Sequence, residues 1–111
     1  MDHLADVFTA ISHPSRRAII RRLSESGPAR FIDIAEPFDV ALNAVTKHLK
    51  LLERAGLIRR EKRGREVFIS FQGAPLREAA VWMHEYERFW SERLDHVERF
   101  FIHKRNKEKQ Q

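Results

Sequence analysis

The basic side chains of this sequence are concentrated in one short stretch, and that concentration is its strongest chemical signal. Residues 41–65 contain eight lysines and arginines but only two acids, a balance of +6, whereas all 111 residues together carry +5. The rest of the chain therefore sums to −1. Cations gathered in this way predict a polyanionic partner. The bases of the stretch are Lys47, Lys50, Arg54, Arg59, Arg60, Lys62, Arg63 and Arg65.

Few residues could form a catalytic centre. Cysteine is absent, which excludes disulfides, thiolate metal sites and cysteine nucleophiles. The four glycines form no phosphate-binding loop. Ser12 beside His13 is too little to indicate a catalytic triad, and Glu85 and Glu87 fall on different faces of a helix. The sequence therefore argues against an enzyme.

Length and hydropathy restrict the class further. A chain of 13.2 kDa with 42% hydrophobic residues fits one domain with an ordinary core. Its mean hydropathy is −0.54 and no stretch approaches 18 apolar residues, so we expect no membrane association. The N-terminus does not resemble a signal peptide, and the lack of cysteine fits a cytoplasmic protein.

The residues before position 40 predict three helices that would carry the basic stretch. The first follows Asp2, which is placed to cap it, and the second begins at Pro14 and ends before Gly27. The third, around 31–36, has Arg30 at its cap position, where arginine is a poor capping residue. Apolar residues at helical spacing are expected in the core, namely Leu4, Val7, Phe8, Ile11, Ala18, Ile19, Leu23, Ile34, Ala35 and Phe38.

The basic stretch itself predicts a fourth helix and a hairpin. Residues 41–55 form the helix, and Gly56 is its expected C′ residue. The apolar period then changes from 3.6 to 2, which predicts strands at 57–62 and 66–71 around a glycine-containing tip. The expected core positions of the helix are Val45, Leu52 and either His48 or Leu49. The bases thus lie on one helix and one hairpin.

A long final helix is predicted from residue 75 to residue 104, with a charged tail at 105–111. Its apolar residues step by three or four along one face, which a second row widens. The first row is Leu76, Ala79, Met83, Tyr86, Trp90, Leu94, Val97 and Phe101, and the second is Trp82, Phe89 and Phe100. So wide a stripe usually marks an interface, although it could instead close the core of a monomer. A homodimer through the first and last helices is the simplest explanation.

Three segments resemble the ArsR-type winged helix-turn-helix repressors. They are Ala10–Ile20, Asp33–Phe38 and Ala44–Ile58, and the resemblance continues through the wing, spanning residues 4–100. It implies a mainly α-helical fold with a small β-hairpin, a winged helix-turn-helix with a long C-terminal dimerisation helix. It also implies a dimeric, cytoplasmic bacterial transcription regulator, usually a repressor, that binds an imperfect inverted repeat in double-stranded DNA.

On this basis residues 1–104 form a single domain. The helix-turn-helix would occupy 31–55, the wing 57–71 and the C-terminal helix 75–104. The residues expected in the dimer interface are Leu4, Phe8, Met83, Tyr86, Trp90, Leu94, Val97 and Phe101.

The resemblance assigns DNA contacts to the fourth helix and the wing. Asn43 is the best candidate for reading a base, because its amide can pair bidentately with adenine. Thr46 can contact a base or a phosphate, and His48 is more often a packing residue. Arg16 and Arg17 are expected either on phosphate or paired with acids of the fold. The full DNA-binding set is Leu42, Asn43, Thr46, Lys47, Lys50, Lys62, Arg63 and Arg65.

The sequence departs from the family pattern at its cap and at its metal sites. Ala41 stands where a capping Ser or Thr is common, and Asp39 could replace it. The Cys-x-Cys metal site of the family would fall on 31–35, which has no thiolate. The positions matching a second metal site are Gly73, Pro75, Tyr86 and Phe89, none of them a suitable ligand. We therefore expect no cofactor and no regulatory metal, and leave open an adventitious metal at His84, His96 or His103.

A winged helix that binds protein or RNA is the competing interpretation, because the fold also serves as an interaction module. The +6 balance on the helix and hairpin favours double-stranded DNA. The operator, the regulated genes and a small-molecule effector are not specified by the sequence.

Overall fold

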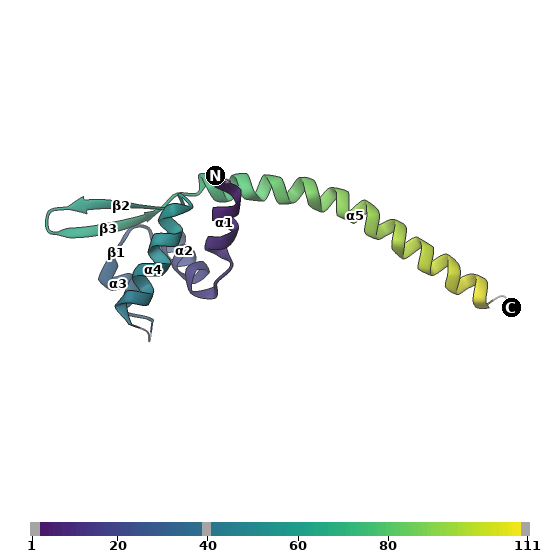
Figure 1. Cartoon of the computed structure of the whole chain (residues 1–111), viewed down its shortest axis with the longest axis horizontal. Coiled ribbons are helices and arrows are strands. Elements are labelled where there is room, and N and C mark those ends of the chain that lie inside the picture. The colour runs from purple at the N-terminus through teal and green to yellow at the C-terminus, as the bar shows by residue number, and fades with distance from the viewer. Residues whose placement is uncertain (1–2, 39–40, 110–111) are drawn as a thin grey trace. The chain divides into compact units, whose positions relative to one another are not determined.

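The computed structural model describes residues 3–38 and 41–109 and divides the chain into two compact units, Met1–Ala79 and Ala80–Gln111. The elements follow the predicted order, with one added strand (Figure 1). They are α1 (His3–Ile11), α2 (Pro14–Ser26), β1 (Ala29–Arg30), α3 (Phe31–Ala35), α4 (Leu42–Arg54), β2 (Ile58–Arg63), β3 (Glu66–Phe71) and α5 (Ala74–Lys109). Asp2 and Asp39, the two expected capping acids, lie outside the described residues.

α2 begins and ends as its sequence predicts. Pro14 occupies the first turn, and the ring nitrogen Nδ1 of His13 accepts a hydrogen bond from the backbone N–H of Ser15 at 3.0 Å. Gly27 ends the helix, and its N–H donates to the carbonyl of Leu23 at 3.0 Å. The predicted core position at Ala18 is wrong, since Ala18 is exposed and Ile20 is buried instead. The buried face of α2 is thus formed by Ile19, Ile20 and Leu23, and Ala18 lies outside it.

The core of the first unit combines residues from every helix of that unit and from the sheet. Leu4, Ile11 and Phe38 are half-buried at its edge, and Phe8 is also half-buried. Leu49 rather than His48 fills the inner position of α4. The buried apolar residues are Val7, Ala10, Ile19, Ile20, Leu23, Ile34, Ala35, Val45, Leu49, Leu52, Ala55, Leu57, Ile58, Ile69 and Ala79.

The sheet is antiparallel with the strand order β1-β3-β2. β1 is only two residues long, which is too short for an alternating pattern, so the sequence did not reveal it. It pairs Ala29 with Ile69 and Arg30 with Phe68. The β2–β3 hairpin continues past this pairing to Arg63 and Glu66, so its outer end has two strands only. In Figure 1 this hairpin projects from the helices of its unit.

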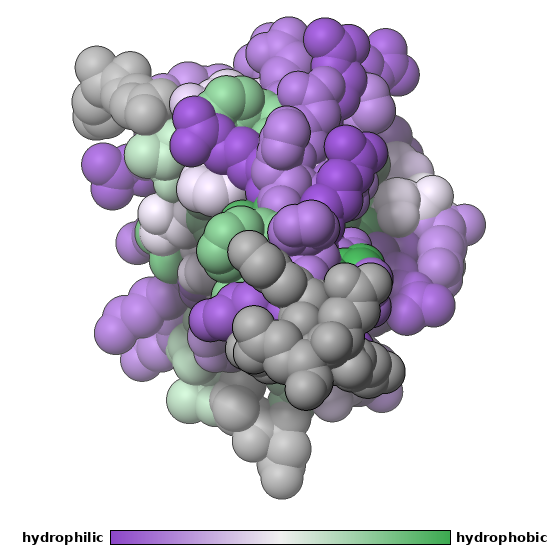
Figure 2. Space-filling model, turned by 90° about the vertical axis from the view of Figure 1, so that its right-hand side faces the viewer, coloured by the Kyte–Doolittle hydropathy of each residue, from purple (hydrophilic) through white to green (hydrophobic). Residues whose placement is uncertain are grey.

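Residues 80–109 of the second unit form one continuous helical segment, about 45 Å long at 1.5 Å per residue. The predicted helix end at residue 104 is too early, because α5 continues to Lys109 through residues with high helix propensity. Every side chain from Ala80 to Asn106 is exposed in the single chain. Within the described ranges, each helix is too short or too polar to cross a bilayer. Figure 2 shows a mostly hydrophilic face with smaller hydrophobic patches.

Candidate nucleic-acid interface

α4 presents the predicted DNA-contacting side chains on its outer face. Val45, Leu49 and Leu52 are buried, so the helix is held along its inner side. Asn43 and Lys47 are exposed one helical turn apart, and Lys50 continues the same face. Leu42, at the first position of the helix, is 61% exposed. The amino-terminal half of α4 is therefore available to a groove.

The two ends of α4 differ in how firmly they are fixed. Ala41 occupies the N-cap position and provides no side-chain hydrogen bond, as its residue type predicts. At the other end Gly56 has a φ of +73°, and the N–H of Leu57 donates to the carbonyl of Leu52 at 3.0 Å. The N–H of Gly56 donates to the carbonyl of Glu53 at 2.9 Å, which completes a Schellman motif.

Thr46 is half-buried and its hydroxyl is already engaged. Oγ1 donates to the carbonyl of Leu42 at 3.0 Å, the bond to residue i−4 that threonine often makes inside a helix. While this bond is held, Thr46 has no hydrogen to donate to a phosphate, whose oxygens only accept. The structure thus favours a contact to a base, by accepting a hydrogen bond or through the methyl group.

The basic side chains of the wing differ in the contacts that they already make within the protein. Lys62, Arg63 and Arg65 are all exposed, and Gly64 makes the tip with a φ of +63°. Arg63 is partly committed, because its Nη2 donates to Glu61 at 3.3 Å and its guanidinium lies 4.8 Å from the centre of the Phe68 ring. Within the described residues no ion pair is recorded for Lys62 or Arg65. These two are the better anion ligands.

Three other bases of residues 41–65 also differ in whether they are paired with an acid. Arg60 is paired with Glu53 of α4, and Arg54 lies 3.8 Å from Asp6 of α1. Arg59, in contrast, is exposed on β2 and has no recorded ion pair among the described residues. The sequence did not single out Arg59, because charge alone does not distinguish it from the paired Arg60. Arg59 adds a further exposed cation to the wing.

His48 packs inside the fold. Its Nδ1 lies 3.0 Å from Nη1 of Arg16, and its ring centre is 4.6 Å from that of His13. Because a guanidinium only donates, Nδ1 must accept, so His48 is neutral with its hydrogen on Nε2. Burial, then the electrostatic effects of His13 and Arg16, lower the pKa of His48 below its usual value. The predicted packing role is confirmed.

Arg16 and Arg17 donate to carbonyls at the end of α1, and neither has a recorded ion pair with an acid of the described residues. Arg16 is 8% exposed, and its Nε and Nη2 donate to the carbonyls of Ala10 and Thr9 at 2.7 and 3.1 Å. Arg17 Nη1 donates to the carbonyl of Ile11 at 2.7 Å. Both expectations for Arg16 were wrong because carbonyls left unpaired at a helix end are acceptors that sequence charge counting ignores.

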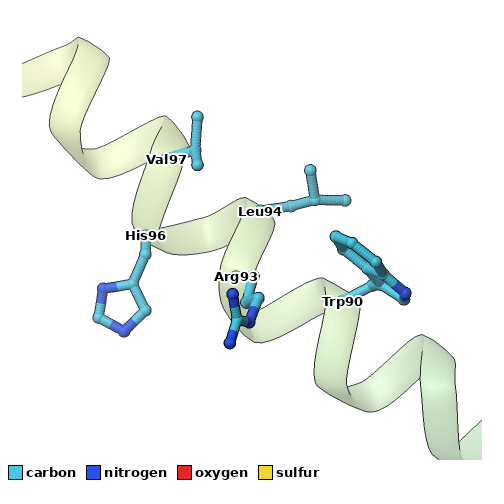
Figure 3. A pocket seen from close by; sticks show the side chains of 5 residues that line it. All are labelled: Trp90, Arg93, Leu94, His96 and Val97. Carbon is cyan, nitrogen blue, oxygen red and sulfur yellow. The ribbon is translucent and has the colours of Figure 1, made fainter.

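α5 exposes the apolar face that the sequence predicted. Trp90, Leu94 and Val97 project from one side of the helix, away from Arg93 and His96 (Figure 3). Arg93 nonetheless lies over the ring of Phe89, at 4.6 Å from its centre. Large apolar side chains from 81 to 102 are at least 40% exposed. Across residues 3–38 and 41–109, no group of three or more metal-ligating side chains is found.

Known proteins of similar sequence and structure are transcriptional regulators. A family described as "Helix-turn-helix domain" matches residues 11–61. The transcriptional repressor SdpR of Bacillus subtilis (strain 168) is 33% identical over 78 residues, which are 70% of this chain and 86% of SdpR. This class of protein is not enzymatic.

Two solved structures extend the match. A crystal structure of an ArsR family transcriptional regulator is 37% identical with a TM-score of 0.73, covering 80% of this chain and 91% of that one. An ArsR-like transcriptional regulator from Rhodococcus sp. RHA1 is 30% identical with a TM-score of 0.72, covering 88% and 92%. They confirm the predicted fold class, a winged helix-turn-helix with a long C-terminal helix.

Proposed function

Since the chain belongs to the ArsR family of winged helix-turn-helix transcriptional regulators, we propose that it is a homodimeric repressor that binds an inverted repeat in double-stranded DNA. The observation that carries the proposal is the position of the exposed cations. Within residues 41–65, the exposed cations without recorded ion pairs lie on the outer face of α4 and on the wing, the two elements that this fold offers to a duplex. Such a regulator works on genomic DNA, in the cytoplasm of a bacterial cell.

The proposed contacts follow from the geometry of each element. Leu42, Asn43 and Thr46 are at the amino-terminal half of α4, which enters the major groove, with Asn43 reading a base. Lys47 and Lys50 bind phosphates beside the groove. Lys62, Arg63 and Arg65 on the wing reach the adjacent backbone or minor groove. Lys62 and Arg65 contribute more than Arg63, because Arg63 must first leave Glu61.

The proposed dimer uses the apolar faces of α1 and α5. In water, an exposed stripe of large apolar side chains over about 30 residues favours association. A second copy is the economical partner, because two identical subunits match two half-sites of an inverted repeat. The proposed interface residues are Leu4, Phe8, Met83, Tyr86, Trp90, Leu94, Val97 and Phe101. We propose that regulation does not use the metal sites of the family, whose ligands this sequence lacks.

The proposal is tested by selecting bound fragments from the source genome while measuring the molar mass by light scattering. We expect a dimer and an enriched motif with half-sites about 34 Å apart, or a multiple of this. The five proposed cations per subunit limit the slope of log K against log salt concentration to about −9 for a dimer. A monomer that selects no duplex at low salt would exclude the proposal. Preference for RNA over duplex DNA would favour the interaction-module alternative.

A further inference from the structure

A group of three charged side chains links the helix-turn-helix to the outer part of the wing. Arg30 donates from Nε and Nη2 to the two carboxylate oxygens of Asp33, at 2.9 and 3.3 Å. Its Nη1 donates to Oε1 of Glu66 at 2.9 Å. We call these three residues the Arg30 network. Arg30 belongs to β1, Asp33 to α3 and Glu66 to β3, so one guanidinium joins three elements.

The Arg30 network lies at the part of the wing where the third strand, β1, has ended. The backbone of Arg30 pairs with Phe68, and its side chain reaches two residues further out along β3, to Glu66. Glu66 is opposite Arg63 in the hairpin and directly follows the tip residues Gly64 and Arg65. Among the described residues no third strand pairs with the hairpin beyond Phe68, so Arg30 reaches a part of the wing that the sheet itself does not hold.

Glu66 pairs with Arg30 and not with the arginine opposite it in the hairpin. Arg63 pairs with Glu61 of its own strand, and no ion pair between Arg63 and Glu66 is recorded in the described residues. The Arg30 guanidinium is the largest cause that lowers the pKa of Asp33. Asp33 is itself fixed by a hydrogen bond from Arg22 of α2 to its carbonyl. The network is therefore anchored on the helical side, and the wing is the part that it restrains.

We infer that Arg30 is a positioning residue for DNA binding, which holds the tip of the wing at a fixed place relative to the helix-turn-helix without touching DNA. This inference rests on the proposed function. Loss of Arg30 would remove the ion pair that ties Glu66 to the helix-turn-helix and leave Asp33 and Glu66 without their shared partner. The wing-tip cations would then meet the backbone of the duplex in many orientations rather than one, which costs affinity through lost preorganisation.

The first test is Arg30→Met, with Arg21→Met as the matched control. Arg21 is exposed whereas Arg30 is half-buried, and its one recorded ion pair is to Glu25 of the same helix, α2, at 3.1 Å. Titrations against a selected duplex should show about three- to fivefold weaker binding for Arg30→Met, the effect that exposed ion pairs can support. The salt slope should not change, whereas losing a phosphate contact would lower it by about 0.9 per subunit. Arg21→Met should bind as the wild type does.

A double-mutant cycle separates positioning from a general structural effect. In a Lys62→Ala/Arg63→Ala/Arg65→Ala background the wing tip has no proposed cation left to position, so Arg30→Met should cost almost nothing further. Equal losses in both backgrounds, a reduced salt slope or unchanged binding would each overturn the inference. If the wild type binds no DNA, the proposed function fails instead.

Glu66→Gln gives a second test that does not touch α3, should Arg30→Met fold poorly. Removing a carboxylate near DNA strengthens binding if its charge is all that matters. The inference predicts the opposite sign, weaker binding, because the amide holds Arg30 less firmly than the carboxylate does. Stronger binding by Glu66→Gln would overturn it.

Discussion

Asn43 and Lys47 lie one turn apart on the same exposed face of α4, yet their chemistry predicts different losses. Asn43→Ala should relax the preference at one base pair, by about 1–3 kcal/mol, because a bidentate contact to a base edge is lost. Lys47→Ala should weaken binding to all duplexes alike and lower the salt slope by about 0.9 per subunit. Titration against the selected duplex and a scrambled one distinguishes them. Equal losses on both duplexes for Asn43→Ala would refute its role as a reader.

His48 predicts a dependence of stability on pH. Its pKa is lowered in the folded state, so the unfolded chain binds the proton more strongly. Stability from neutral His48 is complete above its unfolded value of 6.5 and is lost as the pH falls from there through the folded pKa. His48→Gln keeps an acceptor for Arg16 and cannot titrate. The melting temperature should fall less between pH 7.5 and 5 for His48→Gln than for the wild type.

Single residues show where sequence reasoning succeeded. The apolar spacing of α4 correctly placed Val45 and Leu52, and Gly56 was recognised as its C′ residue. The Arg30 network was missed, because Arg30 was considered only as a poor cap. Asp33, three residues on, gave a local signal, but Glu66 is 36 positions away and no sequence period connects it. Long-range polar contacts leave no such trace in one sequence.

At the scale of elements, the junction from α4 to the sheet depends on Gly56. Its φ of +73° is unfavourable for other residues, and an added Cβ would lie 3.4 Å from Cγ of Pro75 and 3.6 Å from Cε1 of His3. Gly56→Ala should therefore destabilise the fold by about 1 kcal/mol or more. Gly73→Ala is the control, since Gly73 precedes α5 without a positive φ. Urea unfolding measures both, and equal midpoints would contradict the prediction.

Elements were predicted to the extent that their patterns repeat. The four long helices and β3 show a period of 3.6 or 2 over enough residues to be recognised. In contrast, α3 and β2 were located from the elements and turns beside them, because β2 has only charged residues after Ile58. β1 has two residues and no period, so it becomes visible only through its pairing with β3. The end of α5 was placed too early, because its charged last turns were interpreted as frayed rather than as good helix formers.

At the scale of the whole molecule, the proposed dimer interface on α5 can be tested separately from DNA binding. Leu94→Glu places a charge in the apolar face beside Trp90 and Val97, and burying it in a dimer would be costly. The variant should shift the measured mass towards the monomer and weaken binding to the inverted repeat. Arg88→Glu, also exposed on α5 but outside the apolar rows, is the control. A Leu94→Glu protein that stays dimeric would contradict the proposed interface.

The corner between α1 and α2 has a consequence for how the chain assembles. Arg16 and Arg17 bond to carbonyls only six or seven positions earlier, so these contacts close short loops at small entropic cost. His48 joins the same guanidinium from 32 positions away. The corner can therefore form first, and α4 docks later onto an arginine that is already held in place. Slow docking of α4 during synthesis would leave a chain in which α1 and α2 are already packed while the helix proposed to bind DNA is not yet in place.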